Sequence, residues 1–401
     1  MFSSYQETAV LGAGICGRLI ALRLAMNGHR VTLFEAAELK SRQSCSAAAA
    51  GMLSPIAEAA YGDTDLLELG LESLTMWRDL GQQLFHNDVP PDELTGLSAS
   101  SRTHDRTVSE FPKISFKGTL ILAHGQNVDE LREFQRRIDQ KIGSFPINRL
   151  NQKELSELEP SLAQTFERGL YIPQEGHVNT WSILDQLAEN LLTAGVIIRE
   201  NSHVTEVSPG TVTFHDQEEF NKTIHFDMVF DCRGFGAKKD IHGLRGVRGE
   251  SLIIKLPRNV QQTLTIGRPV RILHPRYPIY IVPRTPEILV VGATMIESES
   301  LEPITVGASL EIMTALYHTH EAFKYASILD TVTALRPTLS HHHPRIFVEP
   351  GLMRVNGLFR HGFLLAPVVA KTAIACYQKD PLSPRHKEIV YCNQPEGNDG
   401  R

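Results

Sequence analysis

The sequence lacks any apolar run approaching the roughly 18 residues that a transmembrane helix needs, so we expect no membrane span. It also lacks a CxxC pair, and an odd number of scattered cysteines indicates free thiols rather than a disulfide or zinc framework. The net charge of −6 is too small to indicate a nucleic-acid or membrane-surface partner. We therefore expect a soluble, cytoplasmic protein. The five cysteines are Cys16, Cys45, Cys232, Cys376 and Cys392.

Several common catalytic motifs are absent as well. The 401 residues contain no GxxxxGK[ST], no HExxH and no GxSxG. His341, His342 and His343 are consecutive, and consecutive side chains do not share one face of a helix or strand. We interpret them as an exposed polar loop and expect no metal site. Hydrophobic residues make up 42% and charged residues 21%, as in an ordinary globular protein of two or three domain-sized units.

What the sequence does contain is a βαβ pattern at its start. Residues 7–12 end in a short apolar run that is typical of a buried parallel strand. Residues 15–27 place apolar side chains on one helical face, and Gly28 follows where a helix is expected to end. Residues 31–35 predict a second strand. Together these segments predict an α/β domain with a parallel sheet.

The turn between the first strand and the helix reads GAGICG, which gives Gly12, Gly14 and Gly17 the GxGxxG spacing of a dinucleotide-binding turn. Its glycines allow a tight turn, close approach of a pyrophosphate, and close packing of helix on strand. Glu35 ends the second strand, where its carboxylate can accept hydrogen bonds from ribose hydroxyls. It disfavours the 2′-phosphate of NADP and leaves FAD and NAD. The position at the start of the chain and a second glycine turn at 234–236 favour FAD.

The rest of the chain is predicted to alternate helices and strands. Between 247 and 294 the apolar period is close to two, and SLIIKL, TLTI, IYIVP and ILVVGAT predict successive strands of one antiparallel sheet. Residues 88–116 are polar and predict a long loop or insertion. The remaining expected elements are helices at 65–86, 181–194 and 306–326, a strand at 196–199, a hairpin at 203–216 and a strand that enters a glycine turn at 226–236.

Four further motifs occur in order: SAAAAGMLSP (46–55), YIVPR (280–284) with VGATM (291–295), ALRP (334–337) and FRHGFLLAP (359–367). With the glycine turn they make the sequence resemble the D-amino-acid-oxidase superfamily of FAD-dependent oxidoreductases, and within it the bacterial glycine oxidases of thiamine biosynthesis. The resemblance implies non-covalent FAD and an α/β fold in which a Rossmann-like FAD-binding domain carries a second, antiparallel-sheet substrate domain.

The same resemblance implies domain boundaries and a set of cofactor contacts. The FAD-binding domain is expected at 1–86, 150–245 and 327–390, the substrate domain at 87–149 and 246–326, and a flexible tail at 391–401. The residues expected to contact FAD are Gly12, Gly14, Ile15, Cys16, Gly17, Glu35, Ala36, Ser46, Ala49, Ala50, Gly51, Met52, Val204, Gly234, Arg336, Arg360, His361, Gly362, Phe363 and Leu364.

Four residues match positions that line the substrate pocket of glycine oxidases: Tyr280, Met295, Arg336 and Arg360. The resemblance implies that Arg336 anchors the substrate carboxylate and that Tyr280 is a second donor to it, with Arg360 also in the catalytic set. An arginine suits this task because its planar guanidinium binds a carboxylate through two parallel hydrogen bonds. Core packing is the alternative for Tyr280, and a solvated loop cation is the alternative for Arg336. We interpret Met295 as packing rather than chemistry.

The segment NGLFRHGFLLAP (356–367) is expected to begin a helix that faces the cofactor. We expect the amides of Gly362 to Leu365 to point at the pyrimidine edge of the isoalloxazine, where a helix N-terminus stabilises the negative charge that develops on reduction. Pro367 is expected in the first helical turn, where an amide hydrogen is not needed. Arg360 is then placed at the junction of the flavin and the substrate pocket, with His361 beside it.

The expected reaction is oxidation of a CH–NH or CH–NH2 donor: a small, glycine-like amine or amino acid transfers hydride from its α-carbon to flavin N5, and O2 accepts the electrons to give an imine and H2O2. The alternative is a flavoprotein of the same fold that oxidises a side chain of a partner protein, such as a maturation enzyme for a protein-derived quinone cofactor in an amino-acid oxidase. Departures from glycine oxidases motivate it: Pro278 replaces a histidine, and TLSHHHPRIFVE (338–349) replaces glycine turns. A dehydrogenase that reduces a quinone is a third interpretation. The sequence predicts no oligomeric state.

Overall fold

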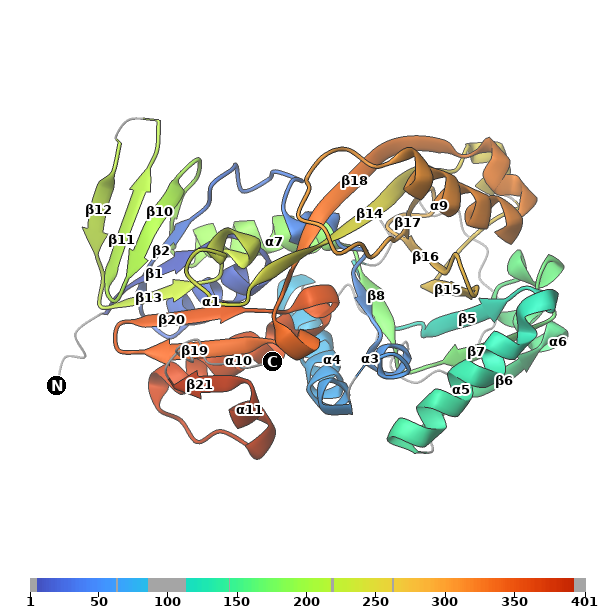
Figure 1. The fold of residues 1–401 in the computed structure, drawn as a ribbon, viewed down its shortest axis with the longest axis horizontal. Coiled ribbons are helices and arrows are strands. Elements are labelled where there is room, and N and C mark those ends of the chain that lie inside the picture. Colours follow the sequence, from blue (N-terminus) through green and yellow to red (C-terminus); the bar gives the residue numbers. More distant parts are fainter. Residues whose placement is uncertain are drawn as a thin grey trace.

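The structure is a computed structural model that describes residues 6–62, 64–85, 113–143, 145–217, 220–261 and 263–392. Two large β-sheets organise the chain, a seven-stranded sheet at the left of Figure 1 and an eight-stranded sheet at the right. Two long strands of the second sheet, β14 (Arg245–Lys255) and β18 (Ser327–Thr338), reach back toward the first sheet (Figure 1). The space between the two sheets holds the site described below.

The seven-stranded sheet has the order β21–β19–β20–β13–β1–β2–β9 and contains the predicted βαβ unit. β1 and β2 are parallel neighbours, and α1 connects them. Every other neighbouring pair is parallel except β19 with β20. The bounds are β1 (Glu7–Leu11), α1 (Ile15–Met26), β2 (Arg30–Phe34), β9 (Ile197–Arg199), β13 (Met228–Asp231), β19 (Arg345–Glu349), β20 (Leu352–Asn356) and β21 (Val390–Cys392).

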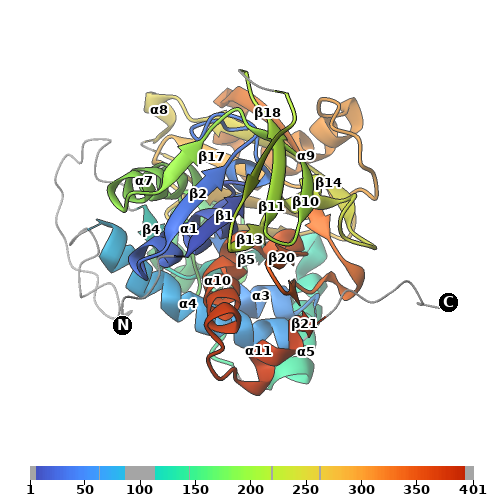
Figure 2. The same cartoon turned by 90° about the vertical axis from the view of Figure 1, so that its left-hand side faces the viewer.

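Both faces of this sheet are buried, because successive side chains of a strand point to opposite faces and both are covered. In β1, Val10 belongs to the core formed with the helices, whereas Ala9 and Leu11 belong to the core formed with a smaller three-stranded sheet. Figure 2 shows the helices on one side of the sheet and the small sheet on the other. The covering elements are α7 (Thr180–Thr193) and α10 (Gly362–Gln378) on one side, and β10 (His203–Ser208), β11 (Thr211–His215) and β12 (Lys222–His225) on the other.

The eight-stranded sheet has the order β18–β14–β17–β16–β15–β5–β7–β6. All its pairs are antiparallel except β5 with β15, so the expected antiparallel sheet contains one parallel pair. In β16, Ile279 and Ile281 face the core under α9, whereas Tyr280 and Val282 face the other side. The remaining bounds are β5 (Thr119–Ala123), β6 (Asn148–Asn151), β7 (Arg168–Ile172), β15 (Val270–Leu273), β16 (Ile279–Pro283), β17 (Ile288–Gly292) and α9 (Val306–Thr319).

The remaining elements connect and cover the two sheets. Within the part of the chain that the structure describes, no helix combines the length and the apolar character needed to cross a membrane. The elements are α2 (Cys45–Ala48), β3 (Met52–Leu53), α3 (Pro55–Ala59), α4 (Thr64–Phe85), β4 (Ile114–Ser115), α5 (Val128–Ile142), α6 (Gln152–Leu158), β8 (Gly176–Val178), α8 (Arg258–Gln261) and α11 (Pro384–Glu388).

Two expected elements differ from the structure. The segment TLTI (263–266) is not a strand: the amides of Thr263 and Leu264 both donate to the carbonyl of Val260, which makes a turn after α8. Its apolar residues are in the core without strand pairing. The helix expected at 306–326 ends at Thr319, because His320 has an extended backbone and its ring nitrogen accepts a hydrogen bond from the next segment.

The expected domain boundaries stay a prediction, although strand pairing bears on them. β6, β7 and β18 fall in or reach into segments assigned to the FAD-binding domain, and all three are hydrogen-bonded into the eight-stranded sheet. Of the insertion expected at 88–116, residues 88–112 lie outside the described residues and β4 occupies 114–115. Of the tail expected at 391–401, the first two residues belong to β21 and the others lie outside the described residues.

Pro367 lies in the interior of α10, at its sixth residue, so its expected place in the first turn is wrong. A proline has no amide hydrogen, and the carbonyl of Phe363, four residues earlier, therefore lacks its helical donor. The indole of Trp77 on α4 supplies that donor: its Nε1 lies 2.8 Å from the carbonyl oxygen. Trp77 is fully buried and its ring stacks on that of Phe363. A tertiary contact thus satisfies the group that the proline leaves without a partner.

We predict that Trp77→Phe lowers the free energy of unfolding by about 1–3 kcal/mol, because a buried carbonyl loses the indole donor while an aromatic ring is kept at the position. In a Pro367→Ala background the same substitution should cost less, since the new amide at position 367 can bond to the carbonyl of Phe363. Urea unfolding of the four proteins measures this coupling. Equal losses in both backgrounds would contradict this account of the proline inside α10.

Candidate active site

The glycine turn between β1 and α1 has the geometry that the spacing predicts. Gly12 has a φ of +87°, and a Cβ there would meet the carbonyl oxygen of Cys232 at 2.8 Å. A Cβ on Gly17 would overlap the carbonyl oxygen of Gly12, so Gly17 allows the helix to pack on the strand. The amide of Ile15, the first residue of α1, donates to the hydroxyl of Ser46 at 3.0 Å. The glycine turn therefore contacts the short helix α2, to which Ser46 belongs.

Glu35 lies directly after β2, with its carboxylate beside the glycine turn. Its two oxygens accept the amides of Ala13 at 2.6 Å and Ala37 at 3.2 Å. These bonds hold the carboxylate at one end of a large cavity whose lining includes Glu35 and Ala36. Two backbone amides therefore fix the Glu35 carboxylate at the place where a ribose contact is predicted.

One cavity of about 1340 Å³ collects almost all of the predicted site residues. It runs between the two sheets, and Gly17 is the single predicted residue that does not line it. Met295 lines its wall with 62% of its surface exposed, so it is not a core residue, and its contact with a substrate stays a prediction. The predicted residues on its lining are Gly12, Gly14, Ile15, Cys16, Glu35, Ala36, Ser46, Ala49, Ala50, Gly51, Met52, Val204, Gly234, Tyr280, Met295, Arg336, Arg360, His361, Gly362, Phe363 and Leu364.

The small-residue segment around α2 is held against the cavity by Arg284, which follows β16. Its guanidinium donates to the hydroxyl of Thr180 at 2.6 Å and to the carbonyls of Ala47 and Ala49 at 3.3 and 3.1 Å. It also stacks over the ring of Trp181, 4.1 Å from the centroid. Burial lowers the pKa of Arg284 to about 9. The arginine of the YIVPR motif is therefore a positioning residue for the cavity wall.

The cavity floor is the face of the eight-stranded sheet that carries Tyr280 and Arg336. Both side chains lie along the sheet, each over a glycine of a neighbouring strand. A Cβ on Gly292 of β17 would meet the hydroxyl of Tyr280 at 3.0 Å. A Cβ on Gly249 of β14 would overlap the guanidinium of Arg336. The two missing Cβ atoms give both polar groups room to lie flat on the floor.

Arg336 is held by dipoles rather than by a charge. Its Nη1 donates to the carbonyls of Thr294 at 3.1 Å and Arg248 at 3.3 Å. Among the described residues no carboxylate forms an ion pair with it. It belongs to strand β18 and is half-buried, so the solvated-loop alternative does not describe it. Burial raises the pKa of Tyr280, which keeps its hydroxyl protonated as a donor beside this cation.

Glu58, on the short helix α3, binds two other arginines that reach the cavity. Its carboxylate pairs with Arg360 on one oxygen and with Arg271 of β15 on the other. Burial acts to raise the pKa of Glu58, but the guanidiniums of Arg360 and Arg271 outweigh it and hold that pKa well below its usual range. The carboxylate is therefore ionised at neutral pH. This pair explains how the cation expected near the flavin is stabilised.

A second buried carboxyl group, that of Glu175, holds the backbone next to Glu58. Glu175 is fully buried, and its Oε1 accepts the amide of Ala57 at 2.7 Å, one residue before Glu58. Burial raises the pKa of Glu175 to about 7, against the opposing effect of the Ala57 amide. The hydroxyls of Ser54 and Thr119 lie beside it, 3.1 Å from each other. Glu175 thus connects α3 with Thr119 of β5 in the eight-stranded sheet and helps to fix the position of Glu58.

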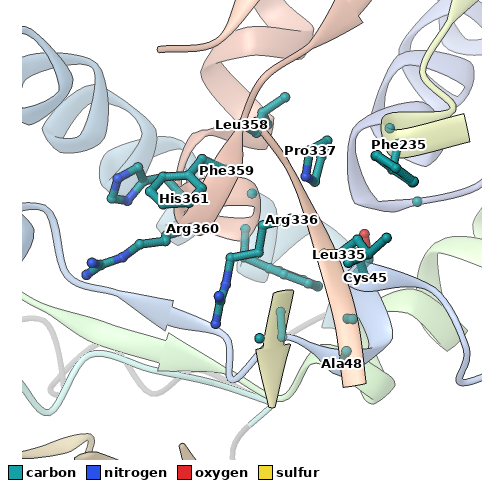
Figure 3. A pocket seen from close by; sticks show the side chains of 18 of the residues that line it. Cys45, Ala48, Phe235, Leu335, Arg336, Pro337, Leu358, Phe359, Arg360 and His361 are labelled. Carbon is teal, nitrogen blue, oxygen red and sulfur yellow. The ribbon is translucent and has the colours of Figure 1, made fainter. Parts of the chain in front are cut away.

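The start of α10 is at the opposite wall, as the sequence predicts. Figure 3 shows Arg336 from β18 pointing down and Arg360 from the turn before α10 pointing to the left, and both side chains line the cavity. His361 precedes the first residue of α10. Burial lowers its pKa to about 4, so the ring is neutral at neutral pH. The positive charge here comes from the arginines and the helix N-terminus.

Sequence reasoning missed Glu58, Arg271, Gly249 and Gly292. A signal existed for two of them. Glu58 is the only charged residue between Ala47 and Ala60, and Arg271 stands alone in the apolar strand VRIL. A lone charge in an apolar segment is costly unless it is paired, which makes such a residue a candidate for a site. The glycines gave no local signal, because each is needed by a side chain from another strand.

These features fit an enzyme with a dinucleotide cofactor, which the cavity between the glycine turn and the cationic sheet floor would hold. The sequence profile of the DAO family (FAD dependent oxidoreductase) matches residues 7–375. A proposed thiamine biosynthesis oxidoreductase, ThiO, of Rhizobium etli is 34% identical over 361 residues, which cover 90% of this chain and 93% of that protein. The glycine oxidase of Geobacillus kaustophilus is 25% identical over 374 residues and 90% of each chain. The structure of iminodiacetate oxidase from Chelativorans sp. BNC1 matches with a TM-score of 0.75 at 20% identity, covering 96% and 99% of the two chains.

The chain therefore belongs to the DAO family of FAD-dependent oxidoreductases, as the sequence motifs predicted. The expected α/β fold is confirmed, and the cofactor is FAD. The cavity fits FAD: it is continuous from Glu35 past Gly14 to the sheet floor, and a Cβ on Gly14 would approach the hydroxyl of Ser46 at 3.1 Å. Glu35 would hold the ribose and the start of α1 the pyrophosphate, while Gly362 and its neighbours would face the flavin.

We predict that Gly249→Ala weakens the binding of acetate to the holoprotein by roughly 10- to 100-fold, because the new methyl group displaces the guanidinium of Arg336 from a charged hydrogen bond. Titration of the flavin absorption spectrum measures the Kd. Gly307→Ala is the control, because a Cβ there meets no atom within 4 Å. Unchanged acetate affinity in Gly249→Ala would show that the position of Arg336 does not depend on this glycine.

We predict a pH dependence of stability from Glu175. Its folded-state pKa of about 7 lies above the ordinary value of 4.5, so the folded protein binds the proton more tightly and Glu175 makes stability fall as pH rises from about 4.5 through 7. Glu175→Gln keeps the bond from the Ala57 amide and removes this titration, so the melting temperature should decline less between pH 4 and pH 8, either side of this window. The exposed Glu157→Gln is the control. Identical pH profiles for wild type and Glu175→Gln would contradict the assignment.

Proposed function

We propose that this protein oxidises the α-C–N bond of a small amine or amino acid whose carboxylate binds Arg336, with O2 as the electron acceptor. The observation that carries the proposal is the guanidinium of Arg336, which lies on the cavity floor with no acidic partner among the described residues. Two backbone carbonyls orient this planar guanidinium and leave N–H groups that can bind a planar carboxylate. The hydroxyl of Tyr280 lies over the neighbouring strand and supplies a further donor.

The chain's own groups orient the substrate rather than exchange protons with it. Glu58 is a weak base because two guanidiniums hold its carboxylate ionised, and the His361 ring is already neutral at neutral pH. FAD, when bound, would supply the two-electron acceptor for the hydride of the α-carbon; with the amine proton released and O2 as final acceptor, the products would be an imine and H2O2. Arg336 and Tyr280 fix the α-carbon opposite the wall formed by the start of α10, which is the orientation that hydride transfer requires.

The relatives support this reaction class through their names. A glycine oxidase and an iminodiacetate oxidase, as named, both act on molecules with an amine next to a carboxylate-bearing carbon. In this chain the residues that would recognise the shared part of such molecules, Arg336 and Tyr280, occupy one floor of the cavity.

The test is anaerobic mixing of the holoprotein with glycine, sarcosine, D-alanine or D-proline, followed by admission of air. We expect at least one amine to bleach the flavin, and air to restore its colour with release of H2O2. Arg336→Met should lower kcat/KM by roughly 30- to 1,000-fold, or about 2–4 kcal/mol, because the carboxylate loses a charged partner in a desolvated site.

Arg132→Met is the matched control, because its side chain is 72% exposed on the surface of α5. It should leave kcat/KM unchanged. If neither these four amines nor iminodiacetate bleaches the flavin, the proposed reaction fails, and oxidation of a partner protein's side chain becomes the better account.

A further inference from the structure

The cavity floor continues beyond Tyr280 to a second arginine that the proposed reaction does not use. Arg271 of β15 is the direct cross-strand partner of Tyr280 of β16, so the two side chains leave the same face of the sheet. Tyr280 is in turn paired with Gly292, and all three residues line the cavity. The floor therefore carries a guanidinium on each side of the tyrosine: Arg336 toward β18 and Arg271 toward β5.

The guanidinium of Arg271 is buried with donors to spare. Its side chain is 10% exposed, and the exposed part faces the cavity that it lines. Within the described ranges its single hydrogen bond runs from Nη2 to Glu58, and its buried Nε has no partner. Buried guanidinium groups normally use most of their donors, as Arg18 and Arg284 do by bonding to backbone carbonyls and, for Arg284, the Thr180 hydroxyl. Within the part of the chain that the structure describes, Arg284 also has a buried Nε without a partner, but its two other nitrogens donate three hydrogen bonds, whereas those of Arg271 donate one.

Charge is also unbalanced around this end of the cavity. Three guanidiniums, those of Arg336, Arg360 and Arg271, reach it, and Glu58 is shared by two of them. Arg137 and Glu130 also line the cavity, and their charges cancel. Glu175 acts electrostatically on Arg271 but does not line the cavity. Burial raises the pKa of Glu175 to about 7, so its carboxyl is only partly ionised near neutral pH. A substrate with one carboxylate on Arg336 leaves one guanidinium without an anion, which is a costly state in a desolvated site.

We propose that Arg271, together with Arg360, forms a second anion-binding subsite, and that the preferred substrate is an amine or amino acid with a second carboxylate. This inference rests on the proposed function. The guanidinium of Arg336 lies over β14, and β15 is three strands away, which at the usual strand spacing is roughly 14 Å. Subtracting about 3 Å for each charged hydrogen bond leaves roughly 8 Å between the outer oxygens of the two carboxylates. An extended molecule with three atoms between its carboxyl carbons has about this reach.

Binding of two inert ligands isolates the second carboxylate. Oxydiacetate and methoxyacetate differ by that group alone, and neither has a C–N bond to oxidise. We expect the wild-type holoprotein to bind oxydiacetate at least about 10-fold more tightly, as judged by the flavin absorption spectrum. Arg271→Met should remove this preference while the Kd of methoxyacetate changes by less than about threefold, and Arg271→Lys should retain part of it.

Equal affinities of the wild type for the two ligands would overturn the proposal. So would a loss in Arg271→Met that is the same for both ligands, because that result assigns Arg271 a purely structural role beside Glu58. If Arg271→Met does not retain FAD, the ratio of the two Kd values in the wild type and in Arg271→Lys tests the proposal instead.

Turnover separates this inference from the proposed function. Sarcosine and iminodiacetate share an N-substituted glycine and differ in whether the second arm carries a carboxylate. We expect kcat/KM for iminodiacetate to exceed that for sarcosine by at least about 10-fold, and Arg271→Met to bring the two together. If sarcosine bleaches the flavin as fast as iminodiacetate does, the second subsite is refuted and the amine oxidation stands. If neither bleaches it, the reaction class fails, and the binding of the inert ligands still tests the subsite.

Discussion

The site depends on one steric constraint: two strands of the cavity floor carry no Cβ where polar side chains of their neighbours must lie. Gly249 leaves room for the guanidinium of Arg336 and Gly292 for the hydroxyl of Tyr280. Without that room both groups would have to rise from the sheet, away from the carbonyls of Arg248 and Thr294 that hold Arg336 in place. Because Arg336 and Tyr280 lie flat on the sheet, the space between them and the start of α10 can hold an anion beside a flavin.

The buried arginines divide according to the partners they use. Arg18 and Arg284 donate mainly to backbone carbonyls, and burial lowers their pKa values to about 10 and about 9, so they act as cross-links of the cofactor-binding framework. Arg271 and Arg360 share Glu58, and Arg336 has no acidic partner among the described residues. The framework arginines are therefore held by backbone dipoles, whereas at the floor the three guanidiniums have one carboxylate, that of Glu58, among the described residues. Open charge in a desolvated cavity does not stabilise the fold, and its use is recognition of an anion.

The sequence predicted the parts of the site that are local in the chain. The glycine turn, Glu35 at the end of β2 and the start of α10 follow from short motifs with known geometry, and the structure places them around one cavity. It did not predict Glu58 with Arg360, because the two residues are 302 positions apart and their ion pair exists only after the sheets assemble. The error at TLTI has a related cause: apolar residues can be buried in a turn, so periodicity alone did not identify a strand. Pro367 was misplaced because its compensation, the indole of Trp77, comes from another helix.

The most direct test of this account is a crystal structure of the holoprotein with a small inert carboxylate such as methoxyacetate. The account predicts that its carboxylate forms two parallel hydrogen bonds with Arg336, with the hydroxyl of Tyr280 as a further donor, and that the flavin's pyrimidine edge faces the amides at the start of α10. A carboxylate bound elsewhere in the cavity, with Arg336 still held only by its two backbone carbonyls, would contradict the central claim.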